Sequence, residues 1–265
     1  MTSRHGPSAQ VLDAFGVGDV VSRERLAGGR GLTWRVGRLV LRPSGGSSEA
    51  CWRAGVLDAL EHTDEFRTPR PVRTASGAWV VDGWEAWSWV PGAADESRVS
   101  DVLRAADAFH RAIAGLGKPS FIDAADDPWA RADRMAWGED PLPHDPTLDR
   151  LAARFRPVES ARQVIHGDLL GNVLFADGEP PAIIDWAPYW RPAGLGAAIA
   201  VVDAVTWHST PMRAIAGLGA GVPEWSQLVV RALAFRIATF HLLGRWDRAR
   251  SDRYAPLVDA VLTRT

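Results

Sequence analysis

The stretch Gln163–Trp186, QVIHGDLLGNVLFADGEPPAIIDW, constrains this chain more than any other segment. It places four polar residues, His166, Asp168, Asn172 and Asp185, at the ends of short runs of Val, Ile, Leu and Phe. The runs predict short strands at 164–165, 173–175 and 182–185, with ADGEPP as the turn that joins the last two into a hairpin. The polar residues of this stretch are therefore expected at the ends of strands.

The predicted hairpin brings oxygen-bearing side chains together. In an antiparallel pair closed by this turn, residues near 175 face residues near 182, so we expect Asn172 beside Asp185 and Asp168 further along the same rim. Carboxylate and amide oxygens are ligands that Mg²⁺ prefers. A carboxylate that does not bind the metal can accept a proton from a hydroxyl nucleophile. Taken singly, each residue also fits an ordinary capping or turn role.

The order His-x-Asp, then Asn, then Asp after a hydrophobic hairpin resembles the catalytic and metal-binding loops of protein kinases. The form HGDL…GNVLF…IIDW looks more like the aminoglycoside phosphotransferase and choline kinase branch. The resemblance implies a two-lobed α+β fold, with a small antiparallel-sheet N-lobe and a mainly helical C-lobe. It also implies Asp168 as the catalytic base, His166 as support for its loop, and Asn172 and Asp185 as Mg²⁺ ligands. The step from Asp168 to Asn172 is one residue shorter than is usual in the family.

The character of the chain changes at Pro91-Gly92, a natural pivot. Residues 1–10 are polar, with Gly and Pro, and predict a flexible tail. Residues 11–90 predict a small sheet with one helix, which corresponds to the nucleotide-binding N-lobe. Residues 91–265 predict a mainly helical C-lobe that holds the catalytic loop and the acceptor site.

Two hairpins and one helix are predicted within the first lobe. The segments LTWRVGRLVLRP and AWVVDGWEAWSWV each contain two runs of β-favouring residues, separated by Gly37-Arg38 and by Asp82-Gly83. Between them, SSEACWRAGVLDALEH begins with capping serines and has apolar residues at helical spacing, namely Trp52, Val56, Leu57 and Leu60. Further helices are predicted over VSDVLRAADAFHRAIAGL and twice within 224–262.

The resemblance implies an ATP site in the first lobe. Its glycine-rich turn would lie in LAGGRGLTWRV, where the amides of Gly28, Gly29 and Gly31 approach phosphates, although glycines in a hairpin turn need no ligand. The strand lysine of the family has no counterpart, because Lys118 is the only lysine of the chain. We therefore expect Arg42 to contact the phosphates, with a different geometry.

Two further elements of the family pattern are displaced or only partly matched. The resemblance implies a helix glutamate that pairs with the basic strand residue, but the matching position holds Arg53. Glu49 lies one turn earlier on the same face of the helix. It either takes the place of that glutamate or only favours the helix N-terminus. The segment EAWSWVPG resembles the last strand of the first lobe and the hinge. This resemblance implies hydrogen bonds from adenine to the backbone near Ser88 and Val90. Asp203 falls where the family places a buried aspartate that braces the catalytic loop.

The acceptor is predicted from the insert at 118–149, which contains eight acidic against three basic residues. An acidic lip with Trp129 and Trp137 suits a cationic or amino-bearing, hydroxylated small molecule, although a solvated loop is the plainer alternative. Relatives phosphorylate aminoglycosides, other antibiotics, choline, homoserine and sugars. The family therefore does not name the substrate.

Composition excludes several classes of function. The formal net charge of −2 argues against nucleic acid or an anionic membrane as the main partner. The apolar stretches are too short to span a bilayer, and the first ten residues lack the hydrophobic region of a signal peptide, so we expect a cytoplasmic protein. Cys51, the only cysteine, cannot form an internal disulfide. The sequence leaves the oligomeric state undetermined.

Three functions compete at this point. The leading one is a Mg²⁺- and ATP-dependent kinase that phosphorylates a hydroxyl of an aminoglycoside-like molecule, amino alcohol or sugar. A nucleotide-binding pseudokinase is favoured by the short catalytic loop, by Arg42 and by the displaced Glu49, but it has no need of a catalytic base. A metallophosphoesterase would need Asp-x-His and Gly-Asn-His motifs, which the seven histidines do not form.

Overall fold

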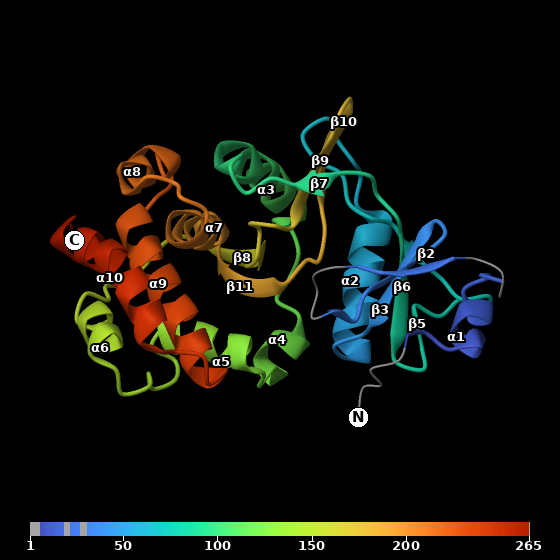
Figure 1. Cartoon of the computed structure of the whole chain (residues 1–265), viewed down its shortest axis with the longest axis horizontal. Coiled ribbons are helices and arrows are strands. Elements are labelled where there is room, and N and C mark those ends of the chain that lie inside the picture. The colour runs from blue at the N-terminus through green and yellow to red at the C-terminus, as the bar shows by residue number, and fades with distance from the viewer. Residues whose placement is uncertain (1–5, 19–21, 27–30, 265) are drawn as a thin grey trace. The chain divides into compact units, whose positions relative to one another are not determined.

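The computed structural model describes residues 6–18, 22–26 and 31–264 of the chain. The chain folds into two compact units, whose elements are labelled in Figure 1. The first unit comprises Met1–Ala93 and Leu174–Asp185, and the second comprises Ala94–Val173 and Trp186–Thr265. The first carries antiparallel sheet and the second is mainly helical, which confirms the α+β class predicted from the sequence.

An antiparallel sheet forms the centre of the first unit. Its strands follow the order β1-β2-β3-β6-β4, and β5 also pairs with β6. The strands are β1 (Arg23–Arg25), β2 (Trp34–Val36), β3 (Leu39–Pro43), β4 (Pro71–Val72), β5 (Val80–Val81) and β6 (Trp84–Ser88). Both predicted hairpins are confirmed. Asp82 and Gly83 join β5 to β6 with φ values of 48° and 74°, the left-handed conformation that a two-residue hairpin turn requires.

Two helices accompany this sheet. The predicted helix is confirmed as α2 (Ser47–Ala59), but the face that it buries differs from the one expected. The buried residues are Ala50, Arg53, Ala54 and Leu57, whereas Trp52 and Val56 are only half-buried. The helix is rotated in this way because Arg53 points to a buried carboxylate described below. A helix that the sequence analysis missed, α1 (Ala9–Ala14), is capped by Ser8 and buries Val11 and Leu12.

The hairpin that carries Asp185 belongs to a second, small sheet. Its strands are β7 (Ala93–Ala94), β9 (Val173–Ala176) and β10 (Glu179–Ile183), in the order β10-β9-β7. The hairpin is confirmed, but its turn is shorter than predicted, because only Asp177 and Gly178 lie between the strands. Arg67 connects β10 to the rest of the first unit through two backbone hydrogen bonds. The N–H of Arg67 donates to the carbonyl of Pro181 at 2.9 Å, and the carbonyl of Arg67 accepts from the N–H of Ile183 at 2.8 Å.

A two-stranded ribbon lies within the second unit. The predicted strand at 164–165 is confirmed as part of β8 (Arg162–His166), which pairs with β11 (Pro188–Pro192). Strand β11 was not predicted from the sequence, and the proline at each of its ends is unfavourable in most strands. A ribbon of two strands tolerates both prolines, since each strand leaves one edge without a partner strand.

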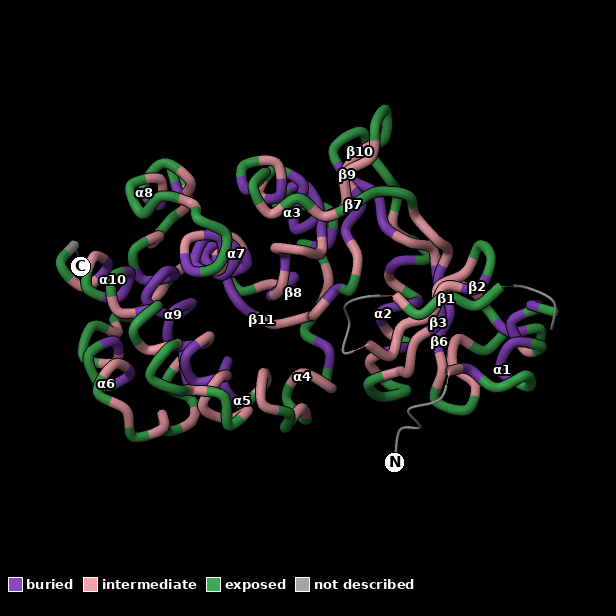
Figure 2. Tube along the Cα trace, viewed as in Figure 1, coloured by how far each residue is buried: buried purple, intermediate pink, exposed green. Residues whose placement is uncertain are grey.

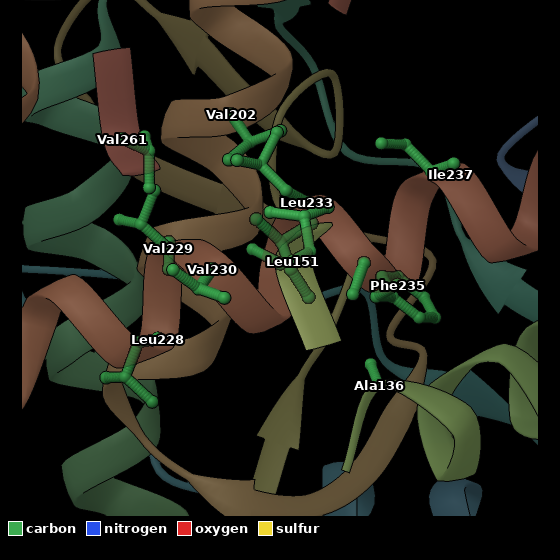
Figure 3. Packing of buried hydrophobic residues seen from close by; sticks show 14 of the residues in the cluster. Ala136, Leu151, Val202, Leu228, Val229, Val230, Leu233, Phe235, Ile237 and Val261 are labelled. Atoms are coloured by element: carbon green, nitrogen blue, oxygen red, sulfur yellow. The ribbon is translucent and has the colours of Figure 1, made fainter. Parts of the chain in front are cut away.

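Helices build the rest of the second unit. They are α3 (Val99–Ile113), α4 (Ser120–Ala124), α5 (Pro128–Ala136), α6 (Pro146–Ala152), α7 (Gly194–Trp207), the 3₁₀ turn η2 (Met212–Ala214), α8 (Ile215–Leu218), α9 (Trp225–Leu242) and α10 (Arg248–Arg264). Helix α9 is buried along most of its length, as the purple segments of Figure 2 show. Figure 3 shows its residues, including Leu233, packed with Leu151 of α6 and Val202 of α7.

Helix α9 was expected from its apolar pattern, and its surroundings explain why it is apolar on every side. It contacts α5, α6, α7 and α10, so no face of its middle turns is left to solvent. A charged residue in the middle of such a helix must therefore have a buried partner. Among the described residues, no helix is long and apolar enough to cross a membrane.

Candidate active site

The end of β8 and the loop after it carry three of the predicted site residues. Val164, Ile165 and His166 are fully buried, and the N–H of Gly167 donates to Ala187 at 3.0 Å. A β-carbon on Gly167 would lie 2.4 Å from the ring of Tyr189, so only glycine fits here. The chain therefore leaves the buried strand at a fixed point, just before Asp168.

Two buried histidines hold this loop. The backbone N–H of Asp168 donates to Nδ1 of His166 at 3.1 Å, and the backbone N–H of His166 donates to Nε2 of His110 at 2.9 Å. Both rings therefore act as acceptors at these atoms. Helix α7 approaches closely at Gly196, where a β-carbon would lie 2.6 Å from the carbonyl oxygen of His166. This arrangement supports the structural role that the resemblance implied for His166, and it shows His110 in a similar role.

The carboxylate of Asp168 has two different oxygens. Oδ1 accepts a hydrogen bond from Nη2 of Arg236 at 2.7 Å, whereas Oδ2 lies 3.4 Å from the amide nitrogen of Asn172. The same amide nitrogen donates to the carbonyl of Asp168 at 2.7 Å. The side chain of Asp168 is half-exposed. The shortened loop thus still places Asn172 against Asp168, and it leaves Oδ2 as the less strongly bonded oxygen.

Arg236 connects the catalytic loop to helix α7. Its Nε donates to both oxygens of Asp203 at 3.0 and 3.1 Å, and its Nη2 contacts Asp203 as well as Asp168. Burial would lower the pKa of Arg236, but the two carboxylates more than offset this and raise it, so the guanidinium stays charged. Burial raises the pKa of Asp203 against the pull of Arg236. Asp203 therefore braces the loop, as the resemblance implied, and it does so through Arg236.

A second cluster of charges lies in the first unit, on β3, β6 and α2. Arg42 of β3 stands opposite Glu85 of β6 in the sheet register, and its Nε donates to Glu85 at 2.6 Å. Its Nη1 contacts the carboxylate of Asp185. Burial would lower the pKa of Arg42, but the ion pairs with Asp185 and Glu85 raise it overall. Arg42 is thus a permanently charged group beside one of the predicted metal ligands.

Glu49 does not pair with Arg42, which corrects one of the two alternatives drawn from the sequence. It accepts from Nη1 of Arg53 at 2.7 Å, one turn further along α2. Arg53 in turn donates from Nη2 to both oxygens of Glu85, at 2.9 and 3.1 Å. The carboxylate partner of Arg42 therefore comes from strand β6 and not from the helix, because the helix position that faces the sheet is occupied by a cation.

Asp185 and Asn172 are chemically suited to a magnesium ion. Asp185 lies just after β10 with φ at 48°, a left-handed conformation that Asp tolerates better than most residues, and its side chain is 46% exposed. The amide nitrogen of Asn172 is bonded to Asp168, so its oxygen is the side-chain atom that could bind a cation. A carboxylate and an amide oxygen are the kind of donors that Mg²⁺ binds. Within the described ranges, no group of three or more His, Cys, Asp or Glu side chains forms a metal site of its own.

The predicted nucleotide contacts are only partly described. Gly28 and Gly29 lie outside the described residues, whereas Gly31 has a φ of 65°, and its carbonyl accepts from Nε of Arg25 at 2.5 Å. At the hinge, the N–H of Ser88 donates to the carbonyl of Arg70 at 2.7 Å. The N–H of Val90 has no acceptor among the residues that the structure describes.

The acidic insert is mostly neutralised by its own surroundings. Seven of its eight acids contact cations or cap helices: Asp123 contacts Lys118, Asp126 and Asp140 contact Arg134, Asp133 and Glu139 contact Arg191, and Asp127 and Asp145 cap α5 and α6. Trp137 packs against the guanidinium groups of Arg162, Arg191 and Arg231. These contacts weaken the expectation of an acidic, Trp-bearing lip that attracts a cationic acceptor.

Glu85 and Arg236 were not predicted from the sequence, although each has a recognisable sequence context. Glu85 is the only charged residue inside the aromatic run WEAWSW, and Arg236 is an isolated cation in ALAFRIATF. A single charge inside an apolar strand or helix predicts a buried partner. The partners lie 43 residues away for Glu85 and Arg42, and 68 residues away for Arg236 and Asp168, so spacing alone could not reveal them.

Comparison with known proteins identifies the family. The sequence profile of the phosphotransferase enzyme family (APH) matches residues 32–199, well over half of the chain. The chain belongs to this family. The resemblance drawn from the HGDL, GN and IDW motifs is therefore confirmed, and the protein is a small-molecule kinase. A search of curated proteins found no match.

Solved structures of antibiotic kinases share the fold. An aminoglycoside phosphotransferase from Alicyclobacillus acidocaldarius is 17% identical, with a TM-score of 0.59 over 99% of this chain and 96% of that one. The spectinomycin phosphotransferase APH(9)-Ia, in complex with ADP and spectinomycin, is 14% identical, with a TM-score of 0.57 and 96% of each chain covered. The amicoumacin kinase hAmiN, in complex with AMP-PNP, Ca²⁺ and Ami, is 12% identical, with a TM-score of 0.56 over 92% of this chain and 88% of that one. At these identities the similarity establishes the fold alone.

Buried His110 makes the stability of the second unit sensitive to acid. Burial and the neighbouring His166 lower the pKa of His110 to about 3, from 6.5 in an exposed histidine. Between these values the unfolded chain binds a proton that the folded chain does not. The contribution of His110 to the free energy of unfolding is therefore fully present above pH 6.5, and it falls with decreasing pH by up to about 1.4 kcal/mol per pH unit.

The variant His110→Gln tests this dependence. Glutamine keeps an acceptor for the His166 N–H and does not titrate, so we expect a shallower loss of stability than in wild type between pH 6.5 and pH 4. Urea unfolding at several pH values in this range measures the slope. Equal slopes for the two proteins would show that His110 is not held neutral in the fold.

Proposed function

We propose that this protein transfers the γ-phosphoryl group of ATP to a hydroxyl of a small molecule, with Asp168 as the catalytic base. The observation that carries the proposal is the asymmetry of the Asp168 carboxylate. Arg236 anchors Oδ1 at 2.7 Å, while Oδ2 has only the 3.4 Å contact with Asn172 on a half-exposed side chain. A base needs this combination of a fixed orientation and an available oxygen.

In the proposed transfer, one bond to the γ-phosphorus forms as another breaks. The acceptor hydroxyl gives its proton to Oδ2 of Asp168 as its oxygen forms a bond to the γ-phosphorus, and the bond from that phosphorus to the bridging oxygen breaks to release ADP. Arg236 holds the Asp168 carboxylate in its orientation before the step. Asn172 holds the loop through its bond to the Asp168 carbonyl. Most of the rate enhancement in this chemistry comes from positioning and electrostatics.

Arg42 and the magnesium ligands bind the phosphates of the nucleotide in this proposal. Asn172 and Asp185 would hold Mg²⁺, which would supply positive charge against the phosphates. Arg42 supplies a fixed cation for the phosphates, and Gly31 supplies a backbone turn. For adenine, the N–H of Val90 is the better donor, since the N–H of Ser88 is already bonded to Arg70. We assign nucleotide binding to the first unit and acceptor binding to the second.

The acceptor class rests on the relatives and not on the acidic insert. The similar structures hold spectinomycin and amicoumacin, whose kinases share the fold. We propose a hydroxylated acceptor of the antibiotic, amino alcohol or sugar type. Because Arg134, Arg191 and Lys118 neutralise most of the insert's acids, a strong preference for cationic acceptors does not follow from the insert.

Replacing the base gives the first test. Asp168→Asn keeps the size of the side chain but removes its basicity, so the transfer of labelled γ-phosphate to pooled hydroxylated acceptors should fall by about 10²–10⁴-fold. Affinity for ATP with Mg²⁺ should persist. Asp177→Asn, the same change in the exposed turn between β9 and β10, is the matched control and should retain wild-type transfer. Unchanged transfer in Asp168→Asn would remove Asp168 from the mechanism.

The metal assignment has a separate test. ATP with Mg²⁺ at about 100 times its Kd should raise the melting temperature of wild type by roughly 5–10 °C. In Asp185→Asn the loss of the anionic ligand should abolish most of the part that depends on Mg²⁺. Thermal shift measurements with and without Mg²⁺ separate the two contributions. A variant that keeps the full Mg²⁺-dependent shift would contradict the role of Asp185.

A further inference from the structure

Glu85 is a buried anion at the centre of an arginine cluster. Its side chain is only 3% exposed, and it accepts hydrogen bonds from Arg42 of β3 and from Arg53 of α2. These hydrogen bonds are 2.6, 2.9 and 3.1 Å long, and they join guanidinium donors to a carboxylate. A carboxylate this deeply buried is stable only with such partners, so strand, strand and helix meet at this one side chain.

The two guanidinium groups share Glu85 as a hydrogen-bond acceptor. Each lies 5.9 Å from the centre of the Trp87 ring, and the side chain of Arg53 is 7% exposed. Two cations this close repel each other unless an anion lies between them. Glu49 offsets the charge of Arg53 from the other side, at 2.7 Å. Arg53 thus holds Glu85 in place. The side chain of Arg42 is 20% exposed, so one edge of its guanidinium group is accessible to a ligand.

The accessible edge of Arg42 carries N–H donors that could bind a ligand. Nε is bonded to Glu85 and Nη1 contacts Asp185, whereas Nη2 has no acceptor in the described part of the chain. A guanidinium is planar, so a bond at Nε also sets the direction of the N–H groups at the other end. Those groups are suited to the oxygens of a phosphate. The orientation of the available donors is therefore set by Glu85.

We propose that Glu85 is a positioning residue that holds the Arg42 guanidinium for a nucleotide phosphate, and that Arg53 secures Glu85 in this role. The proposal rests on the function proposed above, since it needs a nucleotide at Arg42. It assigns to a strand residue, next to Arg42 in the sheet, the anchoring carboxylate that the sequence analysis sought on helix α2. The helix supplies a cation to the cluster instead.

The test compares binding of ATP with binding of adenosine, which has no phosphate. Glu85→Gln should weaken the affinity for ATP with Mg²⁺ by about tenfold, the equivalent of one charge-assisted hydrogen bond. Its affinity for adenosine should stay as in wild type, because Arg42 does not contact the base. Asp82→Asn removes a negative charge from the exposed turn of the β5–β6 hairpin and is the matched control, expected to bind both ligands like wild type.

A double-mutant cycle with Arg42→Gln separates positioning from a general structural role. If Glu85 acts through Arg42, then Glu85→Gln has no further effect on ATP affinity once Arg42 is replaced. Glu85→Asp keeps the buried charge and shortens the side chain, so it covers the case in which Glu85→Gln fails to fold. This variant should also lose affinity for ATP and keep affinity for adenosine.

The outcomes distinguish this inference from the proposed function. If wild type binds ATP and either Glu85 variant binds it equally well, the positioning role is overturned. An equal further loss in the Arg42→Gln background would overturn it as well, because Glu85 would then act independently of Arg42. If wild type binds no nucleotide, the proposed function fails first, and the inference fails with it.

Discussion

The carboxylate of Glu85 between the guanidinium groups of Arg42 and Arg53 is the contact on which the first unit depends. It joins β3, β6 and α2, and it accounts for the face that α2 buries. Removing a single partner from such a buried cluster leaves an uncompensated charge, which costs several kcal/mol. Side chains at these three positions are therefore constrained together, and the orientation of Arg42 toward Asp185 is a consequence of this constraint.

The second unit uses the same chemistry with the charges reversed. Arg236 lies between two carboxylates, and it joins α9, α7 and the catalytic loop through Asp203 and Asp168. Arginine suits both clusters because its fork of N–H groups can bond several carboxylate oxygens at once, which a lysine ammonium does less well. With Lys118 as its only lysine, the chain builds its buried ion pairs from arginine.

The sequence predicted the fold class, both hairpins of the main sheet and the long helices, because each of these has a local pattern. The motif residues were also found locally, since Asp168 and Asn172 lie on one loop and contact each other. The partners of Arg42 and Asp168 could not be predicted in this way. They come from β6 and α9, and a helical or strand period does not encode which distant residue neutralises a buried charge.

One strand was not predicted, and one expectation became weaker, each for a physical reason. Strand β11 has Pro188 and Pro192 at its ends, which are unfavourable in most strands but are accepted at the edges of a two-stranded ribbon. The acidic insert suggested a cationic acceptor because its acids lie close together in the sequence. In the fold, cations such as Arg134 and Arg191 contact these acids. A count of charges along the sequence therefore overstated the negative electrostatic potential that a ligand would meet.

The proposed reaction moves a phosphoryl group from ATP to a hydroxyl. It can be followed by phosphorus NMR of ATP and Mg²⁺ incubated with the protein and with pooled antibiotics, amino alcohols and sugars. We expect a new phosphomonoester signal to replace the γ-phosphate signal as ADP appears. Intact ATP, or inorganic phosphate as the only new product, would show that the protein does not catalyse this transfer.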